Sequence, residues 1–486
     1  MENKINTENL RLPKEFADRM KSMLKEEWEA FEYSYLNDSY RALRINRLKK
    51  GVIREKHSEI LKRAGIDNAE RVEWADDGYY YGNTAYPGKH PYHEAGLYYI
   101  QEPSAMSAAS LLKPSAGDLV LDLCGAPGGK STQLAAYMEQ EGLLISNEIH
   151  PVRCKILSQN IERMGIANAI VTNEDSGTLA KHFPEFFDKI LIDAPCSGEG
   201  MFRKNPQAIE EWSLDNVRMC AERQAEILDD GAAMLKKGGL MVYSTCTFSK
   251  EENEEAIEAF IKRHKDFTVE KQIRLFPHKH KGEGHFAALL KKTSCSGNIP
   301  KAENCIENCE ALNYMNLKAT ANNKDAKNKK TTDRKPDKKQ LSTLKEFISK
   351  TLSSDMEEYI LSGNLILFGE QLYMLPKASP KLSGLKVLRA GLHIGEFKKD
   401  RFEPAHALAL FLGKEDVKNS EDISLSDNRS EKYLRGETIE TDISKGWCLV
   451  CIDGYSTGWG KAAGGQLKNH YPKGLRKQLY YPIERG

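Results

Sequence analysis

The chain has 486 residues, of which 71 are Lys or Arg and 70 are Asp or Glu, so its formal net charge is +1 at pH 7. This length is enough for about three domains, each with its own core. Because the charges nearly balance, any attraction for nucleic acid must come from local patches. No apolar run approaches the roughly 20 residues that span a bilayer, and the N-terminal segment lacks a signal-peptide core, so we expect no membrane partner.

The ten cysteines are scattered along the chain, which suits a reducing compartment and predicts a cytoplasmic protein. Individual thiols are then candidates for chemistry or for core packing. Cys305, Cys309, Cys448 and Cys451 would be zinc donors, but the two pairs are far apart and the second pair sits in a strand-like segment. Three histidines between 276 and 292 likewise lack a cysteine cluster nearby, so we expect no metal site.

Residues 1–50 carry apolar side chains at three- and four-residue intervals and predict amphipathic helices. The run RALRINRLKK at 41–50 has five basic side chains, which we interpret as a solvated helix face. Residues 74–100 are rich in tyrosine, with basic side chains among them. These rings would either stack on bases beside phosphate contacts or pack in a core, and the sequence leaves both open.

From residue 103 to about 292 the pattern alternates between apolar strands and helices. This succession predicts a twisted, mostly parallel sheet with helices on both faces and with ligands above the carboxyl ends of the strands. The expected strands are 119–123, 143–148, 169–172, 189–194 and 240–245, with helices to 138 and over 152–164, 213–236 and 250–264. We expect HFAALL at 285–290 to be a closing strand of the same sheet.

Residues 119–136, LVLDLCGAPGGKSTQLAA, run from an apolar strand through a Gly/Pro turn into a helix. Gly125, Gly128 and Gly129 leave room for close approach, and the N–H groups of the first helical turn point at a ligand above the loop. The ligand would be a nucleotide phosphate or the amino-acid end of a nucleoside cofactor such as S-adenosylmethionine. The end of the loop matches a P-loop, but that motif requires glycine at Cys124, so we favour the cofactor.

Acidic side chains follow three of the expected strands. Glu148 closes the second strand, where a carboxylate can accept hydrogen bonds from both ribose hydroxyls. Asp175 follows the third strand and Asp193 ends the fourth. Each of them alone would be explained as a helix cap or a solvated acid. Three at consecutive strand ends favour a ligand site.

Two cysteines also follow strands, Cys196 in DAPCSGEG and Cys246 in YSTCTFSKEENE. A lone cysteine at such a place is most often a small core residue. Two at the cofactor edge of one sheet indicate chemistry, because a thiolate there can attack an electrophilic carbon. Ser249 and Glu252 have capping-box spacing, which predicts a helix N-terminus close to Cys246 that favours the ionised thiol.

The motifs CGAPGGKS, DAPCSGEG and YSTCTFSKEENE, in this order and spacing, resemble the NOP/SUN family of RNA 5-methylcytosine methyltransferases, which use S-adenosylmethionine. The resemblance covers roughly residues 10–292. One departure is Gly125, where alanine is usual, and we expect it to be harmless. The C-terminal segments FGEQLYMLP, RAGLHIGEFKKDRFEPAHALAL and GYSTGWGK look like the bacterial RsmF type, which modifies 16S ribosomal RNA.

The resemblance implies an α/β protein with a Rossmann-like class I S-adenosylmethionine-dependent methyltransferase core. An N-terminal α/β extension would recognise RNA, and C-terminal α/β and PUA-like β-rich modules would follow. Residues 321–340 have eight Lys or Arg against three Asp and no aromatic residue, which is typical of a disordered basic linker. We expect an RNA-recognition extension at 1–100, the core at 101–292, this linker at 293–342, a small α/β module at 343–415, a polar linker at 416–439 and the PUA-like module at 440–486.

The resemblance also implies roles for the site residues. Cys246 would add to C6 of cytosine, Asp193 would hydrogen-bond the base, and Cys196 would assist release. The target base would be unpaired or flipped out. The implied cofactor contacts are Cys124, Gly125, Ala126, Pro127, Gly128, Gly129, Lys130, Glu148, Asp175 and Asp193.

The implied partner is 16S ribosomal RNA or the small ribosomal subunit, bound by a monomer. Transfer RNA as substrate, and a non-catalytic RNA-binding assembly factor on the same fold, remain alternatives. Trp447, Tyr455 and Trp459 stand among basic residues in the last module, which is the composition of an RNA-binding appendage. A packing surface between domains would explain the same aromatic residues, and the sequence does not decide between these interpretations.

Overall fold

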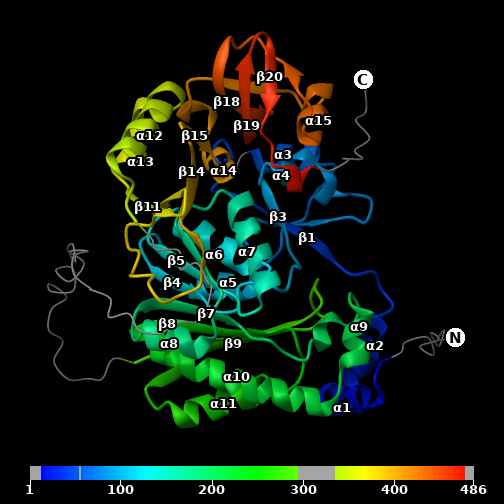
Figure 1. Cartoon of the computed structure of the whole chain (residues 1–486). Helices are drawn as coiled ribbons and strands as arrows, with labels where there is room; N and C mark the ends of the chain where they lie inside the picture. The colour runs from blue at the N-terminus through cyan, green and yellow to red at the C-terminus, as the bar shows by residue number, and fades with distance from the viewer. Residues whose placement is uncertain (1–11, 54–55, 294–333, 477–486) are drawn as a thin grey trace, which may run out of the picture.

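The computed structural model describes residues 12–53, 56–293 and 334–476, and its centre is an eight-stranded sheet (Figure 1). The strand order is β13-β6-β5-β4-β7-β8-β10-β9. The five middle strands are parallel, which confirms the sheet expected from the sequence. They are β4 (Leu119–Asp122), β5 (Leu143–Asn147), β6 (Ala169–Thr172), β7 (Phe187–Asp193) and β8 (Leu235–Thr245). Antiparallel β10 (His285–Lys292) and β9 (Phe267–Leu275) close one edge, and β13 (Val387–Ala390) closes the other.

Helices cover both faces of this sheet, because successive apolar side chains of each strand point to opposite faces. Val120 packs with one cluster of buried side chains, and Leu121 packs with the other. The first cluster includes side chains of α5 (Met106–Leu112), α6 (Gly129–Met138) and α7 (Pro151–Arg163). The second includes side chains of α8 (Ser176–His182), α10 (Leu214–Met234) and α11 (Glu254–Arg263). The loops at the carboxyl ends of β4 to β8 therefore meet at one edge.

The N-terminal unit begins with α1 (Lys14–Leu24) and α2 (Trp28–Ser34) and continues into a three-stranded sheet. Its strands are β1 (Arg41–Ile45), β2 (Gly78–Tyr81) and β3 (Tyr98–Ile100), with helices α3 (His57–Arg63) and α4 (Pro91–Glu94). The expected solvated helix face at 41–50 is wrong. β1 is the central strand of this sheet, and Arg44 and Lys49 are 2% and 3% exposed because other elements supply their hydrogen-bond partners.

After residue 333 the chain forms a four-stranded sheet and contributes one further strand to the large sheet. Helices α12 (Lys338–Thr351), α13 (Ser354–Leu361) and α14 (His406–Phe411) accompany strands β11 (Asn364–Phe368), β12 (Gln371–Leu375), β14 (Leu392–Lys398) and β15 (Arg401–Pro404). Between β12 and β14, β13 leaves this module and pairs with β6. Most of the linker expected at 293–342 lies outside the described residues, but 338–342 belong to α12, which a capping box of Asp337 and Gln340 begins.

The polar linker expected at 416–439 is wrong. It contains β16 (Ser420–Ile423), α15 (Asn428–Arg435) and the start of β17 (Ile439–Glu440), which join β18 (Lys445–Ile452), β19 (Tyr455–Ala463) and β20 (Gln466–Asn469). β16 pairs in parallel with β18, and Tyr433 of α15 is fully buried. Short amphipathic elements read as polar segments because only one narrow face of each is apolar.

One hydrophobic core joins the N-terminal unit to the last module. Tyr92 and Tyr98 from the first pack in the same cluster as Tyr455 and Tyr471 from the second. The tyrosines of residues 74–100 that lie in this cluster therefore serve packing. In the C-terminal module Trp459 is 1% exposed and donates from Nε1 to the Ala405 carbonyl, so it too is a packing residue.

The chain also contains α9 (Pro206–Glu211), which follows the Cys196 loop. Among the helices of the described residues, none has the length and apolar character needed to cross a bilayer.

Candidate active site

The glycine-rich loop joins β4 to α6, as the sequence predicts. Gly128 has φ of +116°, and α6 begins directly after it. The Gly125 N–H donates to the Asn147 carbonyl at 2.7 Å, which holds the loop against the end of β5. A Cβ at Gly125 would lie 2.8 Å from Ser131 Oγ, so alanine here would require Ser131 to shift. Glycine at this position thus lets the loop pack closely on Ser131 in its present conformation.

Asp193 is held between two donors at the end of β7. Lys130 Nζ donates to Asp193 Oδ2 at 2.8 Å, and Ser244 Oγ donates to Oδ1 at 2.9 Å. Burial by itself raises the pKa of Asp193, but Lys130, His285 and these hydrogen bonds outweigh it and lower the pKa below its usual value. Asp193 is therefore an anion with a fixed orientation at neutral pH.

The two predicted thiols lie side by side. The Sγ atoms of Cys196 and Cys246 are 3.2 Å apart, and both side chains are half-buried. The hydrogen bond with Cys246, together with burial, raises the pKa of Cys196 well above its usual value. Cys196 is therefore protonated at neutral pH, and its Sγ lies within hydrogen-bond distance of the Cys246 sulfur.

A buried carboxylate holds the Cys196 loop in place. Glu252 is 0% exposed and accepts from the Ser197 N–H at 2.9 Å, from Ser197 Oγ at 2.5 Å and from Gln224 Nε2 at 2.9 Å. The capping box expected from Ser249 and Glu252 is wrong, because Ser249 bonds Glu251 instead and α11 begins without a side-chain cap. Glu252 serves the thiol pair by fixing the loop of one partner.

The other two predicted acids also lie at this sheet edge. Glu148 follows β5, is 3% exposed and accepts from the His150 N–H at 2.9 Å through Oε1. Asp175 follows β6 and caps α8, accepting from the Thr178 N–H at 2.8 Å and from Thr178 Oγ1 at 2.7 Å. These hydrogen bonds lower the pKa of Asp175, and its side chain remains exposed.

Cys124 is half-buried in the loop after β4, and burial raises the pKa of its thiol, so it is protonated. The exposed Pro127 and the buried Ala126 complete the turn. The structure thus brings the predicted cofactor residues and the predicted catalytic residues to the carboxyl ends of neighbouring strands.

Sequence reasoning missed three polar residues of this site. Asp122, at the end of β4, is fully buried. Ser131 Oγ donates to its Oδ2 at 2.6 Å, and its Oδ1 has no partner within the described part of the chain. Burial raises the pKa of Asp122 to about 7. An acid within the apolar run LVLDL was the available signal. Arg44 donates to Thr132 Oγ1 at 2.7 Å and positions α6, and His285 lies near Asp193.

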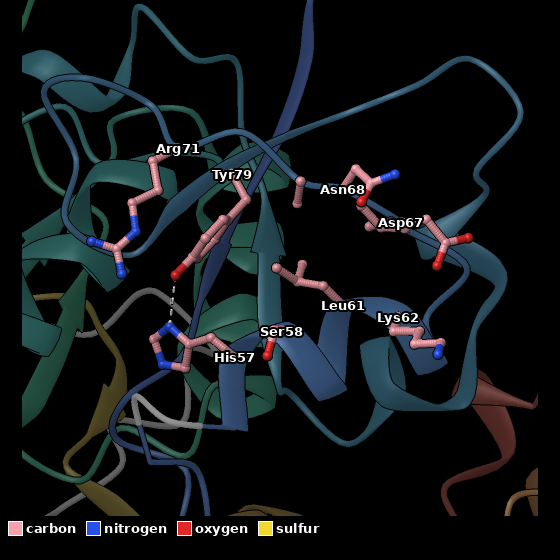
Figure 2. Close-up of a pocket in the computed structure, with 10 residues that line it drawn as sticks. His57, Ser58, Leu61, Lys62, Asp67, Asn68, Arg71 and Tyr79 are labelled. Carbon is pink, nitrogen blue, oxygen red and sulfur yellow. Dashed lines mark hydrogen bonds between the residues drawn. The ribbon is translucent and has the colours of Figure 1, made fainter.

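A separate cavity of about 580 Å³ lies in the N-terminal unit; Figure 2 shows the side chains that line it. His57 and Lys62 of α3 lie on one side of it, and Arg71 and Tyr79 lie across from them. His57 Nδ1 and the Tyr79 hydroxyl form a 3.1 Å hydrogen bond, and the Arg71 guanidinium lies over the Tyr79 ring. All residues that line it fall between 57 and 79, so this cavity is distinct from the candidate site at the carboxyl ends of β4 to β8.

Of the four cysteines considered as zinc donors, the structure describes Cys448 and Cys451, and these two do not converge on one site. Cys448 and Cys451 pack in different hydrophobic clusters, because they point to opposite faces of β18. Cys305 and Cys309 lie outside the described residues. Within the described residues no group of three or more His, Cys, Asp or Glu side chains is arranged to hold a metal ion.

Four family models match successive parts of the chain. They are 16S rRNA methyltransferase RsmB/F over residues 109–291, the N-terminal domain of 16S rRNA methyltransferase RsmF over 12–103, the RsmF rRNA methyltransferase first C-terminal domain over 346–412 and the methyltransferase RsmF PUA domain over 420–477. A Ribosomal RNA small subunit methyltransferase F of Aliivibrio salmonicida (strain LFI1238) is 30% identical, covering 90% of this chain and 91% of its own. The chain belongs to the RsmF family of ribosomal RNA small subunit methyltransferases.

Two further comparisons agree with this assignment. A relative with the same name from Vibrio cholerae serotype O1 (strain M66-2) is 30% identical, covering 96% of this chain and 98% of its own. A crystal structure described as a methyltransferase homolog protein from Pyrococcus horikoshii is 29% identical, with a TM-score of 0.52, covering 58% of this chain and 96% of that chain. The RsmF-type resemblance and the methyltransferase fold expected from the sequence are confirmed.

Proposed function

We propose that this protein transfers the methyl group of S-adenosylmethionine to C5 of a cytosine in 16S ribosomal RNA. The observation that carries the proposal is the pair of thiols 3.2 Å apart beside the oriented Asp193, at the edge where the glycine-rich loop opens. A protein that only binds RNA has no need of a protonated thiol aimed at a second thiol.

The residues at this edge fit the cofactor. The unpartnered, buried Asp122 Oδ1 suits an ammonium donor, and Glu148 at the end of β5 suits ribose hydroxyls. Asp175, at the next strand end, is assigned to the adenine edge. Gly128 adopts φ of +116°, which favours glycine, and a Cβ at Gly129 would lie 3.3 Å from Gln101 and Tyr99. When bound, S-adenosylmethionine supplies a sulfonium methyl group, the electrophile of the reaction.

The protein's own residues make cytosine reactive. C5 of cytosine is a poor nucleophile, and addition of the Cys246 thiolate at C6 gives C5 enamine character. Asp193, as an anion, accepts a hydrogen bond from the exocyclic amino group of cytosine and so orients the ring for attack. Because the reacting carbons are shielded in a stacked helix, the cytosine must be unpaired or flipped out.

Cys196 acts on the second half of the cycle. Its S–H is directed at the Cys246 sulfur, so it stabilises the thiolate that leaves when the C6–S bond breaks. The same hydrogen bond supports the Cys246 thiolate before attack. Loss of Cys196 therefore affects release more than attack.

The N-terminal unit and the PUA module are assigned to RNA binding, and their shared hydrophobic core makes them one RNA-facing body. We further propose that the protein acts as a monomer in the cytoplasm and needs no metal ion.

Methylation of purified 16S ribosomal RNA and of isolated small subunits tests the proposal. Each substrate is incubated with the protein and S-adenosylmethionine, digested to nucleosides and analysed by mass spectrometry. We expect 5-methylcytosine at a single site by bisulfite sequencing. Methylation of transfer RNA alone would identify transfer RNA as the substrate in place of 16S ribosomal RNA. RNA binding with no methylated nucleoside in any substrate would support the assembly-factor alternative.

A further inference from the structure

His285 is a buried imidazole without a hydrogen-bond partner inside the candidate site. It is the first residue of β10 and is 2% exposed, and among the residues that the structure describes neither ring nitrogen has a hydrogen-bond partner. Its Nε2 lies 3.9 Å from Asp193 Oδ1, too far for a hydrogen bond. A buried polar side chain left unpaired costs stability, which points to a bound group that completes it.

The strand register places His285 next to the nucleophile. β10 runs antiparallel to β8, with Phe286 opposite Thr245. Continued by one residue, this register sets His285 opposite Cys246. A Cβ at Gly200 would lie 2.8 Å from the Cys246 carbonyl oxygen and 3.1 Å from that of Gly284, so both strand ends converge on the Cys196 loop.

The groups around His285 keep it neutral. Burial and the positive charge of Lys130 in α6 lower its pKa to about 4, and the smaller effects of Asp193 in β7 and Glu102 before α5 oppose that shift. At neutral pH the ring therefore carries one N–H and one free lone pair.

We propose that His285 accepts the C5 proton of the target cytosine after methyl transfer, an inference that rests on the proposed function. At that stage C5 carries both the new methyl group and its original hydrogen, and C6 is bonded to the Cys246 sulfur. The imidazole lone pair takes the proton, and the C5–H electron pair forms the C5–C6 double bond. The C6–S electron pair leaves on Cys246, and the imidazolium returns its proton to solvent.

In the proposed function neither thiol accepts the C5 proton. In the proposed function Cys196 is the proton donor to the leaving sulfur, and its Sγ lies 3.2 Å from that of Cys246. A separate acceptor is then needed for the C5 proton. Of the two residues, His285 has the free lone pair.

The test separates methyl transfer from proton loss. RNA labelled with tritium at cytosine C5 is reacted with S-adenosylmethionine carrying a 14C methyl group. The wild-type protein releases one tritium for each methyl transferred. In His285→Gln we expect tritium release to slow by roughly 10²-fold while single-turnover methyl transfer is retained, so that a methylated protein–RNA adduct accumulates.

His285→Phe keeps the ring volume without an acceptor and should give the same result. The matched control is His280→Gln, which changes a histidine of the preceding loop that bonds the Phe276 backbone. S-Adenosylhomocysteine binding by calorimetry shows that each variant is folded. Equal loss of methyl transfer and tritium release without an adduct, or wild-type kinetics in both variants, would overturn the role. No tritium release by the wild-type protein would instead overturn the proposed function.

Discussion

The sulfur atoms of Cys196 and Cys246 lie 3.2 Å apart across the carboxyl ends of β7 and β8. Parallel pairing of these strands, with Asp193 opposite Ser244, brings residues 50 positions apart in the chain to the same point. We propose that Cys196 is the hydrogen-bond donor of this pair and Cys246 the nucleophile, because the contact with Cys246 raises the pKa of Cys196. This asymmetry assigns the two thiols to different halves of one covalent cycle.

Substitution of the two cysteines should therefore affect methylation and adduct formation differently. Cys246→Ala should abolish methylation and form no protein–RNA adduct, because no thiolate can add to C6. Cys196→Ala should still methylate once and then release slowly, so a denaturation-resistant band should build up with cofactor present. Gel electrophoresis after denaturation measures both. Cys448→Ala, which changes a buried cysteine of the last module, is the control. An adduct in the Cys246 variant and none in the Cys196 variant would exchange the roles.

Cofactor affinity should depend on Glu148. We expect Glu148→Ala to weaken S-adenosylhomocysteine binding by roughly 10- to 100-fold, the worth of one hydrogen bond to a charged acceptor. Isothermal calorimetry measures the change. Glu141→Ala removes an exposed carboxylate at the opposite end of the same strand and should leave binding unchanged. Equal affinities in the Glu148 variant and the wild type would remove Glu148 from the cofactor site.

The free energy of unfolding should fall as pH drops from about 6.5 to about 4. Burial lowers the pKa of four histidines to about 4, namely His90, His285, His393 and His406. In this window these histidines are protonated in the unfolded chain but not in the folded chain. Each of them therefore lowers the free energy of unfolding by roughly 1.4 kcal/mol per pH unit as the pH falls. Asp122 acts in the opposite direction, because its raised pKa lets the folded chain bind a proton below about pH 7.

Urea unfolding at several pH values between 5 and 7 checks the histidine contribution. We expect His406→Gln to make the slope shallower by roughly 1.4 kcal/mol per pH unit. His150→Gln, at an exposed position, should leave the slope unchanged. Parallel curves for the wild type and the His406 variant would contradict the assignment.

Lys49 should hold the N-terminal unit to the C-terminal half. Its Nζ donates to the carbonyls of Leu410 and Ser456 at 3.0 and 2.7 Å and to Ser456 Oγ at 2.8 Å, and burial lowers its pKa to about 7. Lys49→Met leaves these buried acceptors unpaired and should cost roughly 2 kcal/mol of unfolding free energy. Lys62→Met, at the surface, is the control. Chemical denaturation measures both, and equal stability of the two variants would show that the contact is dispensable.

The fold of the core and most of the candidate site could be predicted because their signals are local. A strand, a glycine turn and a helix start are contiguous at 119–136, and the acids and thiols stand directly after apolar strands. Parallel strands bring those positions to one edge whatever the loop lengths are. Asp122 was missed because it lies inside an apolar run, and His285 because it stands at the start of one. Only packing shows that polar atoms of both lack partners among the described residues.

The sequence by itself determined the succession of strands and helices in the core, the chemistry of the glycine-rich loop and the family motifs, since each depends on residues close together in the chain. Tertiary structure decided that Arg44 and Lys49 are buried rather than solvated, because their acceptors come from residues far along the chain. It also decided that the segment at 416–439 is folded and that β13 extends the methyltransferase sheet. Such contacts join segments of high sequence separation, and short amphipathic elements carry no local signal of the partner that will bury them.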